Sequence, residues 1–235
     1  MEKETPYIER SIKATRLAFG LDQVQMQAYQ EILKDEAIEL TETDYYSCLG
    51  MDDRTFIETA YLRAGRELTA DRNKEINDAK TARWREIIDE EIPLFAGVEN
   101  FVKKMEKEFA LGIVSMARRE EIEYILEKTG LMGCFSAIIS AEDVENCKPN
   151  PECYRKGFNQ IDAFRTRSGS NPIVHGDCLV IEDSPQGIRA GVKAGLKTLG
   201  VTNTVSAKEL YEAGADSVTK NLDDWMPDAV RRVFV

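Results

Sequence analysis

The chain has 235 residues, of which 43% are hydrophobic, and carries a formal net charge of −11, so it can bury a core of ordinary globular size. So negative a charge argues against a nucleic-acid partner, because no basic patch is available to hold phosphates. No apolar run is long enough to span a bilayer and no charged and then apolar leader begins the sequence, so we expect a cytoplasmic protein that does not bind membranes. Five cysteines without regular spacing favour a reducing compartment.

Residues 1–23 give only a weak signal for a regular element. In SIKATRLAFGL (11–21), Lys13 and Arg16 interrupt the apolar residues that a buried parallel strand requires. The apolar residues of the same segment also recur at a helical spacing. We therefore expect one of two elements here. It is either a poor strand, or a helix that leaves the central strand position of the sheet imperfectly filled.

Residues 24–92 contain no convincing strand and are predicted to be helical. VQMQAYQEILKDE (24–36) places its large apolar residues on one helical face. Three N-cap signals follow it, namely a capping box in TETD at 41–44, Asp52 before a helix to Gly65, and Thr69 before a helix that stops ahead of Pro93. The pattern indicates a small all-helical domain inserted into a larger one.

From about residue 95 onward, short apolar runs alternate with helical patterns, which is typical of strand–helix–strand units and a parallel sheet. The segment 162–177 has no periodicity and is predicted to be a loop. The expected fold class is α/β with a helical insertion. The predicted strands are 110–115, 137–140, 178–181, 197–201 and a weaker one at 215–219.

Polar residues follow three of these strands, at the edge of a parallel sheet where ligands bind. Ser115 follows the first strand, Lys148 follows the second after a short loop, and Glu182 with Asp183 follow the third. Two adjacent carboxylates repel each other when buried, so the pair calls for a cation. Oxygen ligands with no nearby histidine or thiolate favour Mg²⁺ over zinc.

A lysine and a hydroxyl on the same rim suit a phosphoryl group, because they offer a positive charge and a hydrogen-bond donor to its oxygens. Each residue alone has a plainer explanation: Ser115 as a turn residue, Lys148 as a solvated loop lysine, and the acidic pair as a helix cap. Their occurrence together in this order favours the ligand site. The small residues at 187, 190, 191 and 194 share a helical face that lets this helix approach the sheet closely.

Three stretches carry a resemblance to the haloacid dehalogenase-like superfamily, in the branch that holds phosphoglycolate phosphatase and β-phosphoglucomutase. CLVIEDSPQGIRAGVKAGLKTLGV (178–201) closely resembles its fourth, acidic motif. CKPNPECY (147–154) resembles the third motif, and LGIVSMARREEIEYIL (111–126) resembles the second. YYSCLGMDDRTFIE (45–58) is similar to the loop of the cap that faces the substrate.

The resemblance implies a Rossmann-like parallel-sheet core, residues 1–23 and 93–235, with a helical cap at 24–92. It also implies Mg²⁺-dependent phosphoryl transfer through an aspartyl-phosphate, on a small phosphorylated sugar or acid. Ser115 and Lys148 would bind the phosphate and Lys148 would also neutralise the nucleophile. Glu182 and Asp183 would hold the metal, and Arg54 in the cap loop would reach the distal part of the substrate.

The family's first motif is a strand that ends in Asp-x-Asp-Gly, and its two aspartates should fall near Lys13 and Thr15. Neither side chain can replace a carboxylate nucleophile. Three hypotheses therefore stay open: an enzyme of the phosphatase or phosphomutase lineage, a non-catalytic binding or regulatory protein that keeps the fold, and an N-terminally mis-assigned product of an active phosphatase gene. Dehalogenation itself is disfavoured, because it does not require the metal that the acidic pair suits. Neither the substrate nor the oligomeric state is assigned.

Overall fold

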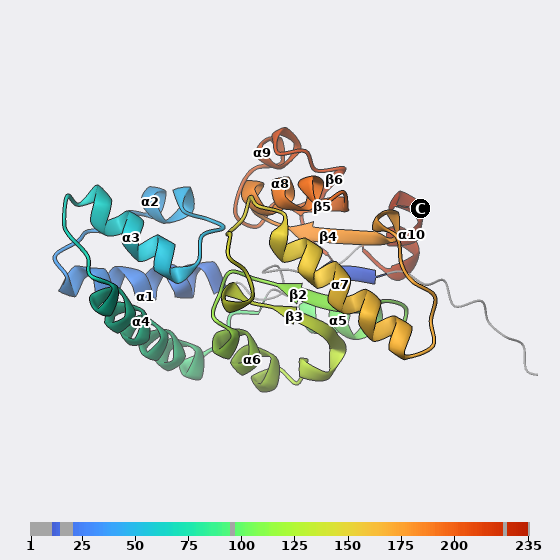
Figure 1. The fold of residues 1–235 in the computed structure, drawn as a ribbon, viewed down its shortest axis with the longest axis horizontal. Coiled ribbons are helices and arrows are strands. Elements are labelled where there is room, and N and C mark those ends of the chain that lie inside the picture. The colour runs from blue at the N-terminus through green and yellow to red at the C-terminus, as the bar shows by residue number, and fades with distance from the viewer. Residues whose placement is uncertain (1–10, 15–20, 95–96, 223–224, 235) are drawn as a thin grey trace, which may run out of the picture.

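The computed structural model describes residues 11–14, 21–94, 97–222 and 225–234. Its centre is a six-stranded parallel sheet in the order β3-β2-β1-β4-β5-β6, whose strands lie one above another in Figure 1. The predicted strands after residue 95 are all present, with ends that differ by a few residues. The strands are β1 (Ser11–Ala14), β2 (Ala110–Val114), β3 (Phe135–Ile139), β4 (Cys178–Glu182), β5 (Lys197–Val201) and β6 (Ser217–Thr219).

The short strand β1 occupies the centre of the sheet. Ile12 is in register with Leu111 of β2 on one side and with Leu179 of β4 on the other. Of the two alternatives for the first residues, the strand is therefore correct for residues 11–14, and Lys13 lies within it. Thr15, the second position where an aspartate is expected, lies outside the described residues.

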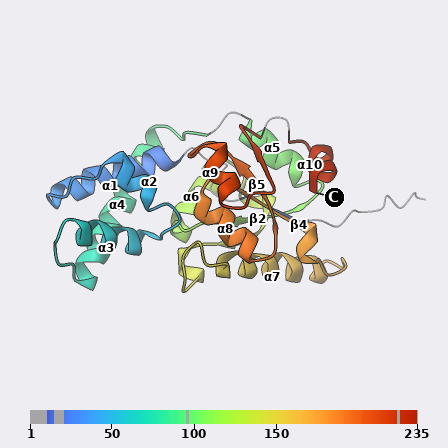
Figure 2. The same ribbon diagram turned by 90° about the horizontal axis from the view of Figure 1, so that it is seen from above.

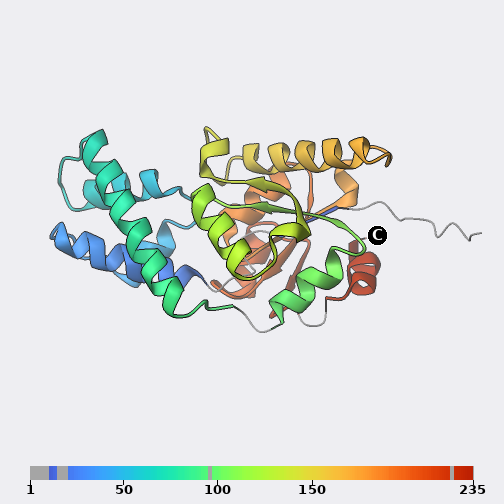
Figure 3. The ribbon, with the colours of Figure 1, turned by 90° about the horizontal axis from the view of Figure 1, so that it is seen from below.

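Helices cover both faces of the sheet, as the two turned views show (Figures 2 and 3). Parallel strands in such a layered fold are apolar on both sides, and β4 is buried along its whole length. Leu179 and Ile181 of this strand join one apolar cluster and Val180 joins the other. One face of the sheet packs against α5 (Val98–Met105), α6 (Arg119–Lys128) and α10 (Pro227–Phe234). The other face packs against α7 (Glu152–Arg167), α8 (Pro185–Lys193) and α9 (Ala207–Glu212).

Residues 21–90 form four helices that stand beside the carboxyl edge of the sheet (Figure 1). We call these helices the cap; they are α1 (Leu21–Asp35), α2 (Glu42–Ser47), α3 (Asp53–Arg63) and α4 (Ala70–Glu90). The N-caps predicted at Thr41, Asp52 and Thr69 are all confirmed by side-chain hydrogen bonds to backbone amides. An aromatic cluster around Tyr29 and Phe56 gives the cap a core of its own.

The prediction of a loop over 162–177 is wrong for its first six residues, because α7 continues to Arg167. Arg165 lies one turn after the buried Ile161 and is itself only 6% exposed, so a charged residue occupies a buried position where a hydrophobic residue is expected. Asp162 accepts a hydrogen bond from the amide of Ile173 at 2.8 Å and ties the following segment to the helix.

In the part of the chain that the structure describes, no helix is both long and apolar enough to cross a membrane.

Helix α8 begins against the end of β4, and its small face makes this approach possible. Ser184 caps the helix by accepting a hydrogen bond from the amide of Gly187 at 3.0 Å. A Cβ atom on Gly187 would lie 2.0 Å from Cδ of Glu182, and one on Gly191 would lie 2.9 Å from Cγ2 of Thr198. The predicted close packing is therefore confirmed, and it holds the carboxylate of Glu182 under the first turn of the helix.

We expect Gly187→Ala to lower the free energy of unfolding by about 1–3 kcal/mol, because the added methyl group overpacks the site against a buried carboxylate. Urea unfolding measures the change. Gly133→Ala is the matched control, since no atom lies within 4 Å of the position of its new Cβ, and a change within about 0.5 kcal/mol is expected. Equal effects of both substitutions would contradict the packing that we describe.

Candidate active site

The carboxyl edge of the sheet brings together the lysine and the acidic residue that follow two different strands. Lys148 lies in the loop between β3 and α7, and its side chain is 4% exposed. Its Nζ donates to Oε1 of Glu182 at 2.5 Å and to the carbonyl oxygen of Val114 at 3.3 Å. Because Ser115 is the next residue after Val114, the ammonium group lies beside the ends of both β2 and β4.

The carboxylate of Glu182 is fully engaged by groups of the protein. Oε1 accepts hydrogen bonds from Lys148 and from the hydroxyl of Tyr154, the latter at 2.8 Å. Oε2 accepts from the amides of Asp183 and Ser184 and from the hydroxyl of Ser184, at 3.0–3.2 Å. A carboxylate has about four lone-pair sites, so these five donors leave it no vacant acceptor position.

The surroundings of Glu182 favour its charged form. Burial alone would raise the pKa of this carboxyl, but the Lys148 ammonium and the hydrogen bonds from Lys148, Tyr154 and Ser184 outweigh it and hold the pKa below the ordinary value. The resulting contribution to stability is present above the ordinary glutamate pKa and is lost as the pH falls through the lowered one. The two buried residues therefore form an ion pair at neutral pH.

Asp183 points to a different neighbour. It is 2% exposed, and its Oδ2 accepts a hydrogen bond from the hydroxyl of Thr204 at 2.8 Å. The same hydroxyl lies 3.4 Å from Oδ2 of Asp22, at the start of α1, and the hydroxyl of Tyr45 lies 3.4 Å from the other oxygen of Asp22. Two carboxylates from the cap and the core thus approach one threonine hydroxyl.

Ser115 is buried directly after β2, where its amide donates to the carbonyl oxygen of Ile139 at 2.9 Å. Its Oγ accepts a hydrogen bond from the amide of Ala117 at 3.1 Å. No hydrogen bond between described residues uses this hydroxyl as a donor, which suits a group that donates to a ligand oxygen.

Arg54 is the one predicted site residue that the structure does not bring to this group. Its side chain is 76% exposed, and its Nε pairs with Glu58 at 3.0 Å on the same helix. It lines a polar cleft of about 440 Å³ between the cap and the core, together with residues such as Arg118 and Glu142. Among the described residues it has no contact with Ser115 or Lys148.

Mg²⁺ prefers oxygen ligands and usually keeps several of its water molecules when it binds a protein. Asp183 fits, because its neighbours Asp22 and Thr204 are also oxygen donors. Oε1 of Glu182 can bind the ion only if Lys148 no longer donates a hydrogen bond to that oxygen. Within the described ranges, no three side chains of the types His, Cys, Asp or Glu are grouped closely enough to hold a metal by themselves.

Sequence reasoning missed two side chains that shape the site. Tyr154 is fully buried and has a sequence signal, since it stands within the CKPNPECY stretch. Thr204 has none, because it lies in the loop after β5 and meets Asp183 only through the fold.

We expect Lys148→Met to lower the free energy of unfolding by about 3–5 kcal/mol, because it leaves the buried charge of Glu182 without its cation. The double variant Lys148→Met/Glu182→Gln removes that charge, and its loss should be smaller by about 0.5–3 kcal/mol than the sum of the two single losses. Urea unfolding of the four proteins measures this coupling. Lys208→Met is the matched control, because the Lys208–Glu212 pair lies within one helix at the surface; a coupling near zero would contradict the buried pair.

Glu152 fixes the loop that carries Lys148, since its carboxylate accepts hydrogen bonds from the amides of Glu145 and Asn146 at 3.0–3.2 Å. Lys156 and these amides lower the pKa of Glu152 to about 2. We expect an NMR titration of its carboxyl carbon to have a midpoint near that value, with the Glu145 amide shifting in parallel as the pH falls through it. Lys156→Gln should raise the midpoint, and a wild-type midpoint near 4.5, the ordinary value, would contradict the clamp.

Comparison with known proteins places this arrangement in a family. Residues 22–201 match the haloacid dehalogenase-like hydrolase family, a span that includes the cap, Ser115, Lys148 and the acidic pair. This is more than half of the chain.

Curated relatives match over shorter segments. An uncharacterized protein of Haemophilus influenzae is 34% identical over 110 residues, which are 47% of this chain and 48% of that protein. Validoxylamine A 7′-phosphate phosphatase of Streptomyces hygroscopicus subsp. limoneus is 31% identical over 114 residues, 48% of each chain. Pyrophosphatase PpaX of Bacillus pumilus is 32% identical over 117 residues, 49% of this chain and 50% of that one. The chain spans about half the length of the curated relatives that it matches.

Solved structures extend the likeness to almost the whole fold. The β-phosphoglucomutase of Clostridium difficile has a TM-score of 0.83 at 16% identity and covers 97% of both chains. CbbY of Rhodobacter sphaeroides in complex with phosphate has a TM-score of 0.78 at 19% identity, over 92% of this chain and 96% of that one. At such identities the structures establish the fold, and the match over residues 22–201 establishes that the chain belongs to the haloacid dehalogenase-like hydrolase family.

Proposed function

We propose that the chain binds a small phosphorylated sugar or acid with Mg²⁺ and transfers its phosphoryl group, as a member of the phosphatase and phosphomutase lineage. The observation that carries the proposal is the meeting of Lys148 with the ends of β2 and β4, beside Ser115 and the acidic pair. One relative, named for its action on validoxylamine A 7′-phosphate, supports the substrate class.

In this proposal the hydroxyl of Ser115 donates to one phosphoryl oxygen and the ammonium of Lys148 neutralises the charge of the others. Asp183 and Glu182 hold Mg²⁺, which when bound supplies positive charge to the phosphoryl oxygens. We also propose that residues 24–92 act as the substrate-selecting cap of a core made of 1–23 and 93–235, with Arg54 near the distal part of the substrate.

The ion pair between Lys148 and Glu182 gives this site a particular property. Each residue neutralises the other, so a phosphate without a cation, or a cation without a phosphate, must leave one buried charge unpaired. When both arrive, Lys148 exchanges Glu182 for the phosphoryl group and Glu182 exchanges Lys148 for the metal. Binding of the two ligands is therefore expected to be cooperative.

A second function, binding without turnover, is favoured by one observation: residues 1–21 contain no aspartate. The carboxylate nucleophile of the family has no counterpart there, whereas the residues that we propose as phosphate and metal ligands are present. In that case the same site acts as a sensor of phosphorylated metabolites.

All five cysteines lie in the described part of the chain and none is in a disulfide, which supports a cytoplasmic location for either function.

Calorimetric titration with MgCl₂, with and without saturating inorganic phosphate, tests the site. We expect phosphate to tighten Mg²⁺ binding at least about tenfold, within the usual range of coupling energies, and Asp183→Asn to abolish this effect. Arg232→Gln, a change of an exposed residue on α10, is the control and should bind as the wild type does. Independent affinities for the two ligands would contradict the exchange of partners.

Turnover separates the two functions. A panel of phosphomonoesters with Mg²⁺ is assayed against the wild type and Ser115→Ala, and release of phosphate that falls at least about 100-fold in the variant supports transfer. If phosphate and Mg²⁺ bind cooperatively but no ester is hydrolysed, binding without turnover is the function.

A further inference from the structure

A row of polar contacts joins the last cap helix, α4, to the start and length of α6 in the core. Asp78, Arg85 and Asp89 are spaced by seven and four residues and share one face of α4, whereas Lys80 lies off that face and reaches α6 with its long side chain. The contacts are Asp78 with Arg118 at 3.0 Å, Lys80 with Glu121 at 3.0 Å, Arg85 with Glu120 at 2.8 Å, and Asp89 with Lys128.

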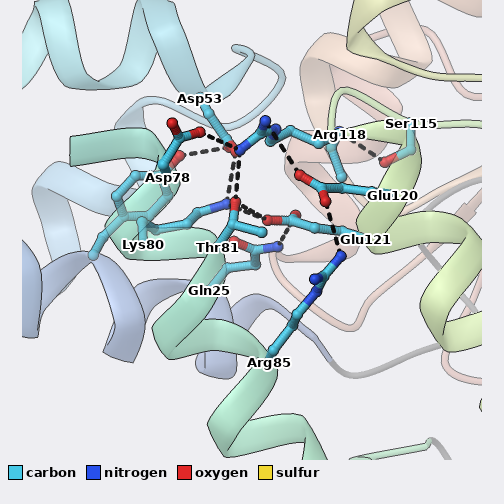
Figure 4. A network of polar contacts seen from close by, with 12 residues as sticks. Gln25, Asp53, Asp78, Lys80, Thr81, Arg85, Ser115, Arg118, Glu120 and Glu121 are labelled. Atoms are coloured by element: carbon cyan, nitrogen blue, oxygen red, sulfur yellow. Dashed lines mark hydrogen bonds and ion pairs between the residues drawn. The ribbon is translucent and has the colours of Figure 1, made fainter. Parts of the chain in front are cut away.

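Figure 4 shows the central contact of this row, between Lys80 and Glu121. The side chains of Lys80 and Glu121 are 0% and 1% exposed, whereas the outer pairs are exposed to solvent. Nζ of Lys80 also donates to Oδ2 of Asp53 at 2.7 Å. Glu121 accepts further hydrogen bonds from Thr81 and Gln25, each at 3.0 Å, so the cap surrounds this core carboxylate on three sides.

The charges of this cluster depend on each other. Burial raises the pKa of Glu121, and Lys80 partly opposes the rise. Burial alone would lower the pKa of Lys80, but Asp53 and Glu121 outweigh it and raise the pKa above the ordinary value. The lysine therefore stays charged, and Glu121 is the core residue that helps to neutralise it.

The cleft of about 440 Å³ that Asp53, Asp78 and Arg118 line does not include Ser115 or Met116, and the cavity on the side of Ser115 is much smaller. Tyr29 and Tyr45 of the cap, with Met116 and Ala117 after Ser115, line a cavity of about 20 Å³, which has room for about one water molecule. A phosphorylated sugar is many times larger. Such a ligand therefore enters this small cavity only if the cap moves.

We propose that the Lys80–Glu121 contact is a latch that holds the cap closed on the core, and that opening of the space beside Ser115 requires this contact to break. Its opening separates a buried ion pair, which is costly unless water reaches both charges. The proposal concerns cap movement and holds whether or not the site turns over a substrate.

Cysteines on both sides of the closed interface report its opening. Cys48 lines the small cavity from the cap, and Cys147 in the core is half-buried with its thiol against Asp52 of the cap. Cys153 and Cys178 lie inside the core, at 0% and 1% exposure, and react only when the core unfolds. Cys134, at the opposite end of β3, serves as an internal reference.

The test is the rate at which iodoacetamide labels each cysteine of the full chain, resolved by peptide mass spectrometry. Glu121→Gln removes the charge but keeps an acceptor for Lys80 and Thr81. Gln25 can adapt by turning its amide, because its Oε1 has no hydrogen-bond partner among the described residues. We expect Cys48 and Cys147 to react at least about tenfold faster in this variant, with Cys153 and Cys178 unchanged.

Glu120→Gln is the matched control, since it makes the same chemical change on the neighbouring residue, whose contact with Arg85 is exposed; less than about a twofold change is expected. Unchanged rates at Cys48 and Cys147 in a folded Glu121→Gln protein would overturn the proposal. If Cys153 and Cys178 also react faster in that variant, its core has unfolded, and Thr81→Val is tested in its place. This substitution removes one hydrogen bond to Glu121 and keeps every charge. Faster labelling of Cys48 and Cys147 alone then supports the latch, and wild-type rates overturn it.

Discussion

The site depends on one interaction, the buried ion pair between Lys148 and Glu182. Neither charge is tolerated there without the other, because each has lost nearly all contact with water. The pair fixes the loop after β3 against the end of β4, and through the carbonyl oxygen of Val114 it also fixes the end of β2. Three loops that are far apart in the sequence are thereby held in one arrangement.

Packing around this pair leaves little freedom for change. The first turn of α8 passes so close to Glu182 that only glycine fits at residue 187, and the amides of that turn complete the hydrogen bonds of the carboxylate. Tyr154 closes the other side from α7. Glu182, which we propose as a metal ligand, thus also stabilises the local fold, so we expect ligand binding to change the stability of this region.

A second buried lysine has a comparable role between the cap and the core. Lys80 is neutralised by carboxylates from both sides, Asp53 in the cap and Glu121 in the core. In our proposals, this cluster controls access to the space under the cap, whereas the pair of Lys148 and Glu182 belongs to the phosphate and metal site.

Local patterns in the sequence predicted much of the fold. Helix caps such as Thr41, Asp52 and Thr69 act within three residues of themselves, so short-range hydrogen-bonding chemistry is enough to find them. The apolar runs gave the strands, and the glycine and alanine spacing gave the small face of α8. The prediction of a loop from residue 162 was wrong, because α7 continues to Arg167 with the buried Arg165 on its inner face. A hydrophobic pattern counts arginine as polar even where its side chain is buried.

The sequence by itself determined the fold class, the order of the site residues and the family resemblance, because these follow from local periodicity and from motifs whose residues are close together. Only the tertiary structure decided that Lys148 pairs with Glu182, that Thr204 meets Asp183, that Arg54 turns to Glu58, and that Lys80 and Glu121 join the cap to the core. The physical reason is that a charge looks solvated in a sequence until the fold removes its water and supplies the partner.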